Sequence, residues 1–290
     1  MAEKHFADML LAAIREKGSP VCVGLDPNLS LMPEEFQDGH DVRGKLKNIE
    51  KFCRGVLETV APIVPAVKPQ MAYFEYFGAA GFDMYFQLSE YAQKLGLIVI
   101  GDAKRGDIGS TASAYAGIHL GRPDSPDALT VNGYFGEDGT KPFIDTASAN
   151  GRGVFVLVRT SNPGGTAIQN FAAADGTMFY EHLARRVAIW GDESIGQSGY
   201  SCVGAVVGAT CPAEAKILRQ IMPKQIFLVP GYGAQGATAK DCAACFNQDG
   251  TGAIINASRC VLYAKPLNGN WKKGVEKAAK DFAQDIANIF

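Results

Sequence analysis

The segment Asp102-Ala-Lys104-Arg-Gly-Asp107 carries the residues whose types and spacing best suit chemistry. It follows the apolar run 97–101, which predicts a buried strand. Side chains two apart on a strand share a face, so Asp102 and Lys104 should project the same way at the carboxyl end of this strand. Asp107 falls just past the strand, where the chain turns into a helix. Two carboxylates around one ammonium suit the transfer of a proton to carbon, beside a substrate that brings its own negative charge.

Two more charged residues follow other apolar runs. Lys68 ends one such run, and beside Asp102 and Lys104 it would extend the charges to an alternating Lys-Asp-Lys-Asp series. A lysine that merely reaches water is the simpler alternative for this position. Asp26 ends another run, where a turn role before Pro27 is the alternative to a role in the site.

A phosphate site is indicated further along the chain. The loop Pro230–Thr238 is rich in glycine, which lets a backbone approach an anion closely. The segment Asn256-Ala-Ser258-Arg259 follows the next apolar run, and Arg259 could bind a phosphate through two parallel hydrogen bonds. Together these segments predict a phosphate-binding site at the ends of two neighbouring strands.

Other reactive residue types receive structural interpretations. Arg105 should point away from the face shared by Asp102 and Lys104, and make a surface or supporting pair. The four histidines lack the spacing of metal ligands, so no metal site is predicted. Cys242-Ala-Ala-Cys245 has C-x-x-C spacing, but no second pair follows, and helix packing is the preferred interpretation.

The elements that must position these residues alternate along the chain. Strands are predicted at Val21–Leu25, Val64–Lys68, Leu97–Asp102, Ala128–Asn132, Gly153–Val158, Cys202–Val207, Ile226–Val229 and Gly252–Asn256. Helical patterns lie between them, including Tyr73–Lys94, Ser110–Leu120, Pro212–Ile221 and Trp271–Ile289. Eight strand–helix repeats favour an α/β fold, a (β/α)₈ TIM barrel, with a doubly wound open sheet as the alternative. A barrel would place Asp26, Lys68, Asp102, Asn132, Thr160 and Ser161, the Gly231–Gly236 loop and Arg259 on one face.

Composition narrows the function classes. The net charge is −2 and no basic run occurs, so nucleic acid is not an expected partner. No apolar run is long enough to span a bilayer, and the amphipathic N-terminus lacks the apolar centre of a signal peptide. Seven cysteines, an odd number, fit reduced thiols and a cytoplasmic location. With 47% hydrophobic residues, residues 1–290 are expected to form a single barrel domain with an N-terminal helix and loop elaborations.

The motifs resemble those of the orotidine 5′-monophosphate decarboxylase family, in its longer bacterial type 2 form. The resemblance spans nearly the whole chain and rests on Val23-Gly-Leu-Asp26-Pro, Val67-Lys68-Pro-Gln, Asp102-Ala-Lys104-Arg-Gly-Asp107-Ile-Gly-Ser-Thr111, Thr160-Ser161-Asn-Pro-Gly, the segment Val229–Gly236 and Ser258-Arg259. It implies decarboxylation of orotidine 5′-monophosphate to UMP without a metal or cofactor. It also implies a homodimer with shared active sites.

The resemblance implies a role for each matching residue. Lys104 would protonate C6, and Asp102 would face the substrate carboxylate. Lys68 would orient Asp102 and contact the ribose. Asp107 and Thr111 would come from the partner subunit and reach a ribose hydroxyl. The remaining residues would bind substrate: Asp26 a ribose hydroxyl, Ser161 the pyrimidine edge, Gln235 and Arg259 the phosphate, with Gly233 in a loop that closes over it.

This chain also departs from the shorter family members. Ser258 stands where they have glycine, which puts the backbone contact to phosphate in question. The segments 27–45, 162–178 and 191–200 are long for a minimal barrel and could be lids or surface elaborations.

Three rival functions remain. Sugar-phosphate decarboxylases and hexulose-phosphate synthases share the D-x-K-x-x-D pattern but bind Mg²⁺, which Lys68 would repel. A Schiff-base aldolase needs a neutral lysine, whereas Asp102 and Asp107 should keep Lys104 charged. A non-catalytic phosphate-binding barrel would leave the alternating charges unexplained.

Overall fold

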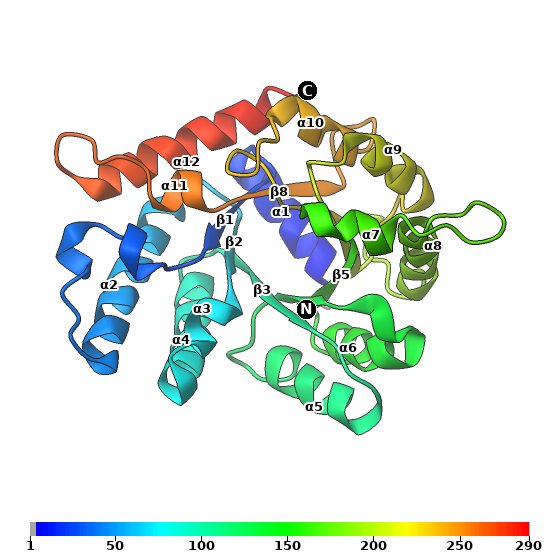
Figure 1. The fold of residues 1–290 in the computed structure, drawn as a ribbon, viewed down its shortest axis with the longest axis horizontal. Coiled ribbons are helices and arrows are strands. Elements are labelled where there is room, and N and C mark those ends of the chain that lie inside the picture. Colours follow the sequence, from blue (N-terminus) through cyan, green and yellow to red (C-terminus); the bar gives the residue numbers. More distant parts are fainter. Residues whose placement is uncertain (1–3, 290) are drawn as a thin grey trace.

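Eight parallel strands close into a barrel in sequence order in the computed structural model, which describes residues 4–289 (Figure 1). The strands are β1 (Val21–Leu25), β2 (Ala66–Pro69), β3 (Ile98–Arg105), β4 (Ala128–Val131), β5 (Gly153–Arg159), β6 (Val203–Val207), β7 (Phe227–Val229) and β8 (Ala253–Ala257). Pairing of β1 with β8 closes the ring, for example at Cys22 and Asn256. The (β/α)₈ prediction is confirmed, and the open-sheet alternative is wrong.

The strand bounds follow the apolar runs closely. Strand β1 has the bounds predicted from the sequence, and the other strands differ by one to three residues at an end. The largest difference is in β3, which continues past the predicted end at Asp102 to Arg105. Polar residues can continue this strand because they lie beyond the apolar core: Lys104 borders the cavity described below, and Arg105 pairs with Glu75 outside it.

Helices surround the barrel and connect its strands. The α-helices are α1 (Phe6–Lys17), α2 (Val42–Val60), α3 (Met71–Glu75), α4 (Gly78–Lys94), α5 (Gly109–Leu120), α6 (Glu137–Ala149), α7 (Thr166–Gln169), α8 (Phe179–Gly191), α9 (Pro212–Ile221), α10 (Ala239–Cys242), α11 (Arg259–Leu262) and α12 (Trp271–Ala287). Short 3₁₀ turns are η1 (Leu29–Leu31), η2 (Glu34–Phe36), η3 (Gly133–Phe135), η4 (Pro163–Gly165) and η5 (Ala243–Cys245). The continuous helix predicted over Tyr73–Lys94 is wrong, because the chain breaks into α3 and α4 at Gly78, whose φ is +67°.

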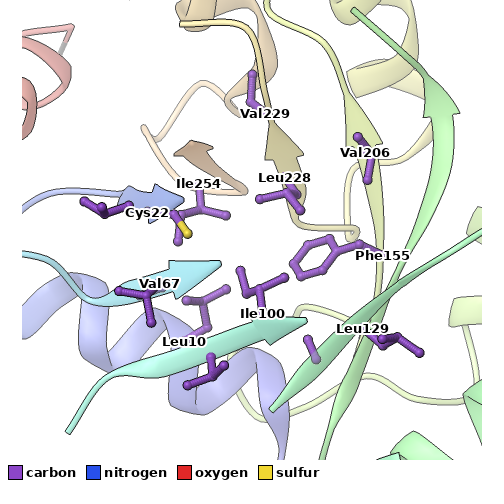
Figure 2. Close-up of a cluster of buried hydrophobic side chains, with 14 of the residues drawn as sticks. Leu10, Cys22, Val67, Ile100, Leu129, Phe155, Val206, Leu228, Val229 and Ile254 are labelled. Carbon is purple, nitrogen blue, oxygen red and sulfur yellow. The ribbon is translucent and has the colours of Figure 1, made fainter. Parts of the chain in front are cut away.

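The core fills the barrel and continues under the helices. Inward residues such as Ile100, Phe155 and Ile254 are fully buried and converge on the barrel axis (Figure 2). Helix α1 crosses one end of the barrel (Figure 1), and its Phe6 meets Phe155 edge-on at 5.7 Å between ring centroids. Phe6 also packs against Gly153, the first residue of β5. The N-terminal helix therefore covers the amino ends of the strands and leaves the carboxyl ends open.

The three long segments are ordered elaborations of the barrel. Residues 27–45 contain η1 and η2 and lead into α2. Residues 162–178 contain η4 and α7 and end in a hairpin-like loop, bridged at Ala172 and Met178, that projects from the molecule beside α8 (Figure 1). Residues 191–200 return to α1, where Asp8 accepts hydrogen bonds from the backbone N–H groups of Gln197 and Ser198 at 3.0 and 2.7 Å. Within residues 4–289, no helix is both long and apolar enough to cross a membrane.

Candidate active site

A cavity of about 430 Å³ opens at the carboxyl ends of the strands. Its floor is apolar and includes Leu157, Val206 and Leu228, and the last two are labelled in Figure 2. Its walls are polar and come from the ends of every strand except β6 and from the loops that follow them. The polar lining residues are Asp26, Lys68, Gln70, Asp102, Lys104, Thr130, Thr160, Ser161, Asn162, Tyr232, Gln235, Asn256, Ser258 and Arg259. An apolar floor with polar walls is typical of a small-molecule site.

The carboxylate of Asp102 is the centre of the charged network. Its Oδ2 atom accepts hydrogen bonds from Lys68 Nζ at 2.7 Å and Gln70 Nε2 at 2.9 Å. Its Oδ1 atom accepts from Lys104 Nζ at 2.5 Å and Thr130 Oγ1 at 3.0 Å. Four donors, from β2 and the residue after it, β3 and β4, therefore fix the position of one buried carboxylate.

Burial and the neighbouring charges have opposite effects on the pKa values of Asp102 and Lys68. Burial alone would raise the pKa of Asp102, but Lys68 and Lys104 outweigh it and hold this pKa well below its ordinary value. Burial alone would lower the pKa of Lys68, but Asp102 and Asp26 outweigh it and raise this pKa. Asp102 is therefore an anion and Lys68 a cation at neutral pH.

The two lysines differ in their exposure. The Lys68 side chain is 6% exposed, whereas that of Lys104 is 47% exposed and borders the open cavity. Lys68 thus holds Asp102 from a buried position at the cavity wall, while the Lys104 ammonium can meet both a bound molecule and water.

Lys104 reaches Asp102 through an irregular strand backbone. Its φ is +49°, in the left-handed region that few residues other than glycine adopt. The pairing of β3 with β4 shifts between Gly101 and Arg105, and the freed Lys104 N–H donates to Thr130 Oγ1 at 3.0 Å. Because Thr130 also donates to Asp102, one hydroxyl supports both the irregularity and the carboxylate. Such strain is typical of functional sites.

The opposite rim of the cavity carries groups suited to an anion. Arg259 is exposed, begins α11, and has no ion pair or hydrogen bond to its side chain among the described residues. Gln235 lines the same rim, in the loop after β7. Gly231, Gly233 and Gly236 all have φ between +68° and +114°, a conformation that requires glycine in this loop.

The same loop is attached to the last long helix. Tyr232 lies against Phe282 of α12, with 4.8 Å between ring centroids. The Tyr232 hydroxyl donates to Asp285 Oδ2 at 2.6 Å. Burial, together with this hydrogen bond, raises the pKa of Tyr232 above its ordinary range.

Ser258 is accommodated because β1 has a glycine opposite it. A Cβ atom added at Gly24 would lie 1.9 Å from Ser258 Oγ. The serine side chain thus occupies space that any larger residue at position 24 would fill. This pairing explains how a serine can precede Arg259 without obstructing the cavity.

Ser161 is positioned by residues outside the cavity. Gln169 of α7 accepts from the Thr160 N–H at 3.0 Å and donates to Thr160 Oγ1 at 2.7 Å. The buried Arg159 donates to the same glutamine at 2.9 Å. A Cβ at Gly208 would lie 2.9 Å from Ser161 Cβ, so this glycine permits the close approach of β6. The long segment after β5 therefore holds the end of that strand in place.

The structure brings seven of the ten sequence-predicted site residues to one cavity and leaves three outside it. Asp26, Lys68, Asp102, Lys104, Ser161, Gln235 and Arg259 line the cavity. Asp107, Thr111 and Gly233 do not line it. Asp107 instead accepts a hydrogen bond from the N–H of Ile108 at 2.8 Å, and Thr111 is exposed on α5.

Two other expectations about this face have clear outcomes. Asn132 does not border the cavity, because β4 ends at Val131 and the Asn132 side chain accepts from the N–H of Tyr134 at 3.0 Å. Arg105 points away from the cavity as expected: it pairs with Glu75 and donates to His119 Nε2 at 3.3 Å.

The remaining reactive residue types have structural surroundings. Cys242 and Cys245 are buried in α10 and η5, and all seven cysteines are free. Among residues 4–289, no group of three or more histidine, cysteine or acidic side chains is arranged to hold a metal ion.

Sequence reasoning assigned no role to several polar residues of the cavity, among them Gln70, Thr130 and Asn256. Gln70 lies two positions after Lys68, so strand alternation could have placed it on the same face. Thr130 is the one polar residue of β4, and Asn256 is the one polar residue of β8. A single polar residue in an otherwise apolar buried strand was the available signal.

Known proteins share both the sequence and the fold of this chain. It is 42% identical to orotidine 5′-phosphate decarboxylase of Rhodopirellula baltica, an alignment that covers 94% of this chain and 96% of the relative. The Deinococcus radiodurans protein of the same name is 41% identical, over 95% of this chain and 96% of its own length. The structure of Leishmania donovani OMP decarboxylase superposes with a TM-score of 0.79 at 32% identity and covers 98% of both chains. The family model of orotidine 5′-phosphate decarboxylase and HUMPS proteins matches residues 19–273, which include every strand and every cavity residue named above, and the chain belongs to this family.

Proposed function

We propose that this protein decarboxylates orotidine 5′-monophosphate to UMP, with Lys104 as the proton donor. The observation that carries the proposal is the buried Asp102 carboxylate held between Lys68 and Lys104 on the wall of a cavity whose opposite rim presents Arg259. A nucleotide with a carboxylate at one end and a phosphate at the other matches these two features. The curated relatives with this name support the same assignment.

The chemical step uses the charges that surround Asp102. The bond between C6 and the substrate carboxylate breaks, CO₂ leaves, and the electron pair stays on C6. The Lys104 ammonium stabilises this developing charge and then transfers a proton to C6, which gives UMP and a neutral lysine. Because nearly half of the Lys104 side chain is exposed, it can regain a proton from water after product release. Asp102 keeps the ammonium in place and faces the carboxylate that must leave.

The phosphate end supplies binding energy away from the reacting carbon. Arg259 and Gln235 are placed to bind the phosphate, and the loop from Gly231 to Gly236 is placed to cover it. Asp26 and Lys68 lie where they can bind ribose, and Ser161 lies across the cavity near the pyrimidine. Remote binding of this kind accelerates the reaction where it helps assemble the closed site.

The positions of Asp107 and Thr111 favour a dimer with shared active sites. Both lie outside the cavity of their own chain, on the segment that leaves β3. Large apolar side chains nearby are exposed, with Ile108 at 55% and Tyr134 at 73%. A two-fold interface over this surface would bury them and bring each Asp107 toward the site of the partner subunit.

Subunit mixing tests the shared site. Lys104→Ala and Asp107→Ala chains are each expected to be inactive. A mixed dimer would hold one site with both changes and one with neither, so activity should return on mixing. No recovery after demonstrated subunit exchange would mean that Asp107 acts within its own subunit, or not at all.

The reaction itself is tested by following the loss of orotidine-phosphate absorbance. Turnover is expected with and without a chelator, because Lys68 lies 2.7 Å from Asp102 and a divalent cation there would be repelled. Chelator-sensitive activity on a sugar phosphate, with none on the nucleotide, would instead assign the chain to the hexulose-phosphate arm of its family.

A further inference from the structure

Asn256 is a buried polar residue of the cavity that the proposed reaction does not use. It lies on β8, is 7% exposed, and lines the cavity. Its Oδ1 atom is buried and has no hydrogen-bond partner within residues 4–289. Buried polar atoms in folded proteins are almost always paired, and an unpaired one costs free energy. An unpaired side chain at this place indicates a group that binds there.

The surroundings of Asn256 limit what that group can be. Asn256 pairs with Cys22 of β1, and the backbone of Gly24, two residues later, lies close to its amide, since a Cβ there would lie 3.4 Å from Asn256 Oδ1 and 1.9 Å from Ser258 Oγ. Asp26, at the end of the same strand, also has a buried and unpartnered Oδ1 atom. Two acceptors without donors thus border the same side of the cavity, at β1 and β8.

The nucleotide offers few groups that can satisfy an acceptor. A phosphate dianion and a carboxylate have no proton to donate. The pyrimidine N–H belongs near Ser161 after β5, three strands away from β8 in the closed strand order. The ribose hydroxyls remain, and a hydroxyl both donates and accepts, so it satisfies the Asn256 amide in either orientation of its oxygen and nitrogen.

We propose that Asn256 binds a ribose hydroxyl of the nucleotide and, with Asp26, selects ribonucleotides over deoxyribonucleotides. This inference rests on the proposed function, because it takes the ligand to be a ribonucleotide. It adds a specificity residue on β8 to a site whose other sugar contacts come from β1 and β2. Loss of one such contact from a buried acceptor weakens binding about 10-fold.

The test is a binding comparison with UMP, 2′-deoxy-UMP, 3′-deoxy-UMP and uridine. One of the two deoxynucleotides lacks the hydroxyl that Asn256 binds. The wild-type protein should bind that deoxynucleotide about 10-fold more weakly than UMP. Asn256→Ala should bind UMP about 10-fold more weakly, yet bind that same deoxynucleotide no more weakly than the wild type does. Asn256→Leu, which fills the volume of the side chain, should behave in the same way and replaces the alanine variant if that variant does not fold.

A packing control separates this role from a structural one. Cys22→Ala removes a buried atom beside Asn256 without removing a polar group, and should discriminate between UMP and both deoxynucleotides as the wild type does. Equal weakening of UMP and both deoxynucleotides in Asn256→Ala overturns the proposal. Weakening of UMP without weakening of uridine also overturns it, because Asn256 would then act on the phosphate. If wild-type protein fails to bind UMP at all, the proposed function fails instead.

Discussion

Replacing each of the two lysines of the network by methionine separates catalysis from folding. Both Nζ atoms contact Asp102, at 2.7 Å for Lys68 and 2.5 Å for Lys104. They differ in exposure, at 6% and 47% of the side chain. Methionine keeps most of the volume and removes the charge, so the two variants differ mainly in which ammonium is lost.

Lys104→Met should fold normally and lose nearly all activity. Asp102 keeps three of its four donors, and a half-exposed ion pair contributes less than about 1 kcal/mol to stability. Losing the electrostatic stabilisation costs about 3 kcal/mol, and losing the proton donor costs about as much again. Together these terms predict a fall in kcat of about 10⁴-fold.

Lys68→Met should lose stability as well as activity. It leaves a buried carboxylate without its buried partner, which costs about 3–5 kcal/mol of unfolding free energy. Urea unfolding gives the stability of both variants, and the loss of orotidine-phosphate absorbance gives their turnover. Near-normal turnover of Lys104→Met would remove Lys104 from the role of proton donor. Equal destabilisation of the two variants would refute the argument from burial.

Three further predictions concern the phosphate, the pH dependence of stability and the core. Arg259→Ala should lower kcat/KM strongly, with partial restoration by added phosphite; unchanged kinetics on the phosphorylated substrate would place the phosphate elsewhere. Burial, with a smaller effect of Arg105, lowers the pKa of His119 from 6.5 to about 4. The neutral form is therefore favoured on folding, and about 3 kcal/mol of stability present above pH 6.5 should be lost as the pH falls to 4. Unfolding curves at several pH values should show that His119→Gln loses less unfolding free energy between pH 6.5 and 4 than the wild type does. An equal loss in both proteins would contradict the lowered pKa of His119. Arg219 donates to four backbone carbonyl groups, so Arg219→Met should cost about 3 kcal/mol or more in urea unfolding but leave turnover per folded molecule unchanged.

The sequence by itself determined the order of the strands and helices. It also indicated that the site lies at one end of the barrel. Eight apolar runs separated by amphipathic segments leave little choice but a parallel sheet with helices outside it. The charged residues that end those runs were visible as interruptions of the apolar pattern, as at Lys68 and Asp102. Local patterns carry this information because burial of a strand demands apolar residues all along it.

Only the tertiary structure decided which polar residues meet. Strand alternation placed Asp102 and Lys104 on one face, but their contact depends on a left-handed Lys104 supported by Thr130, a residue from the next strand. The space that receives Ser258 depends on Gly24, more than two hundred residues away along the chain. Asp107 has the right spacing and yet lies outside the cavity of its own chain. Spacing along one strand fixes direction, whereas contact requires the register and closure of the whole barrel, which are set by packing between residues distant in sequence.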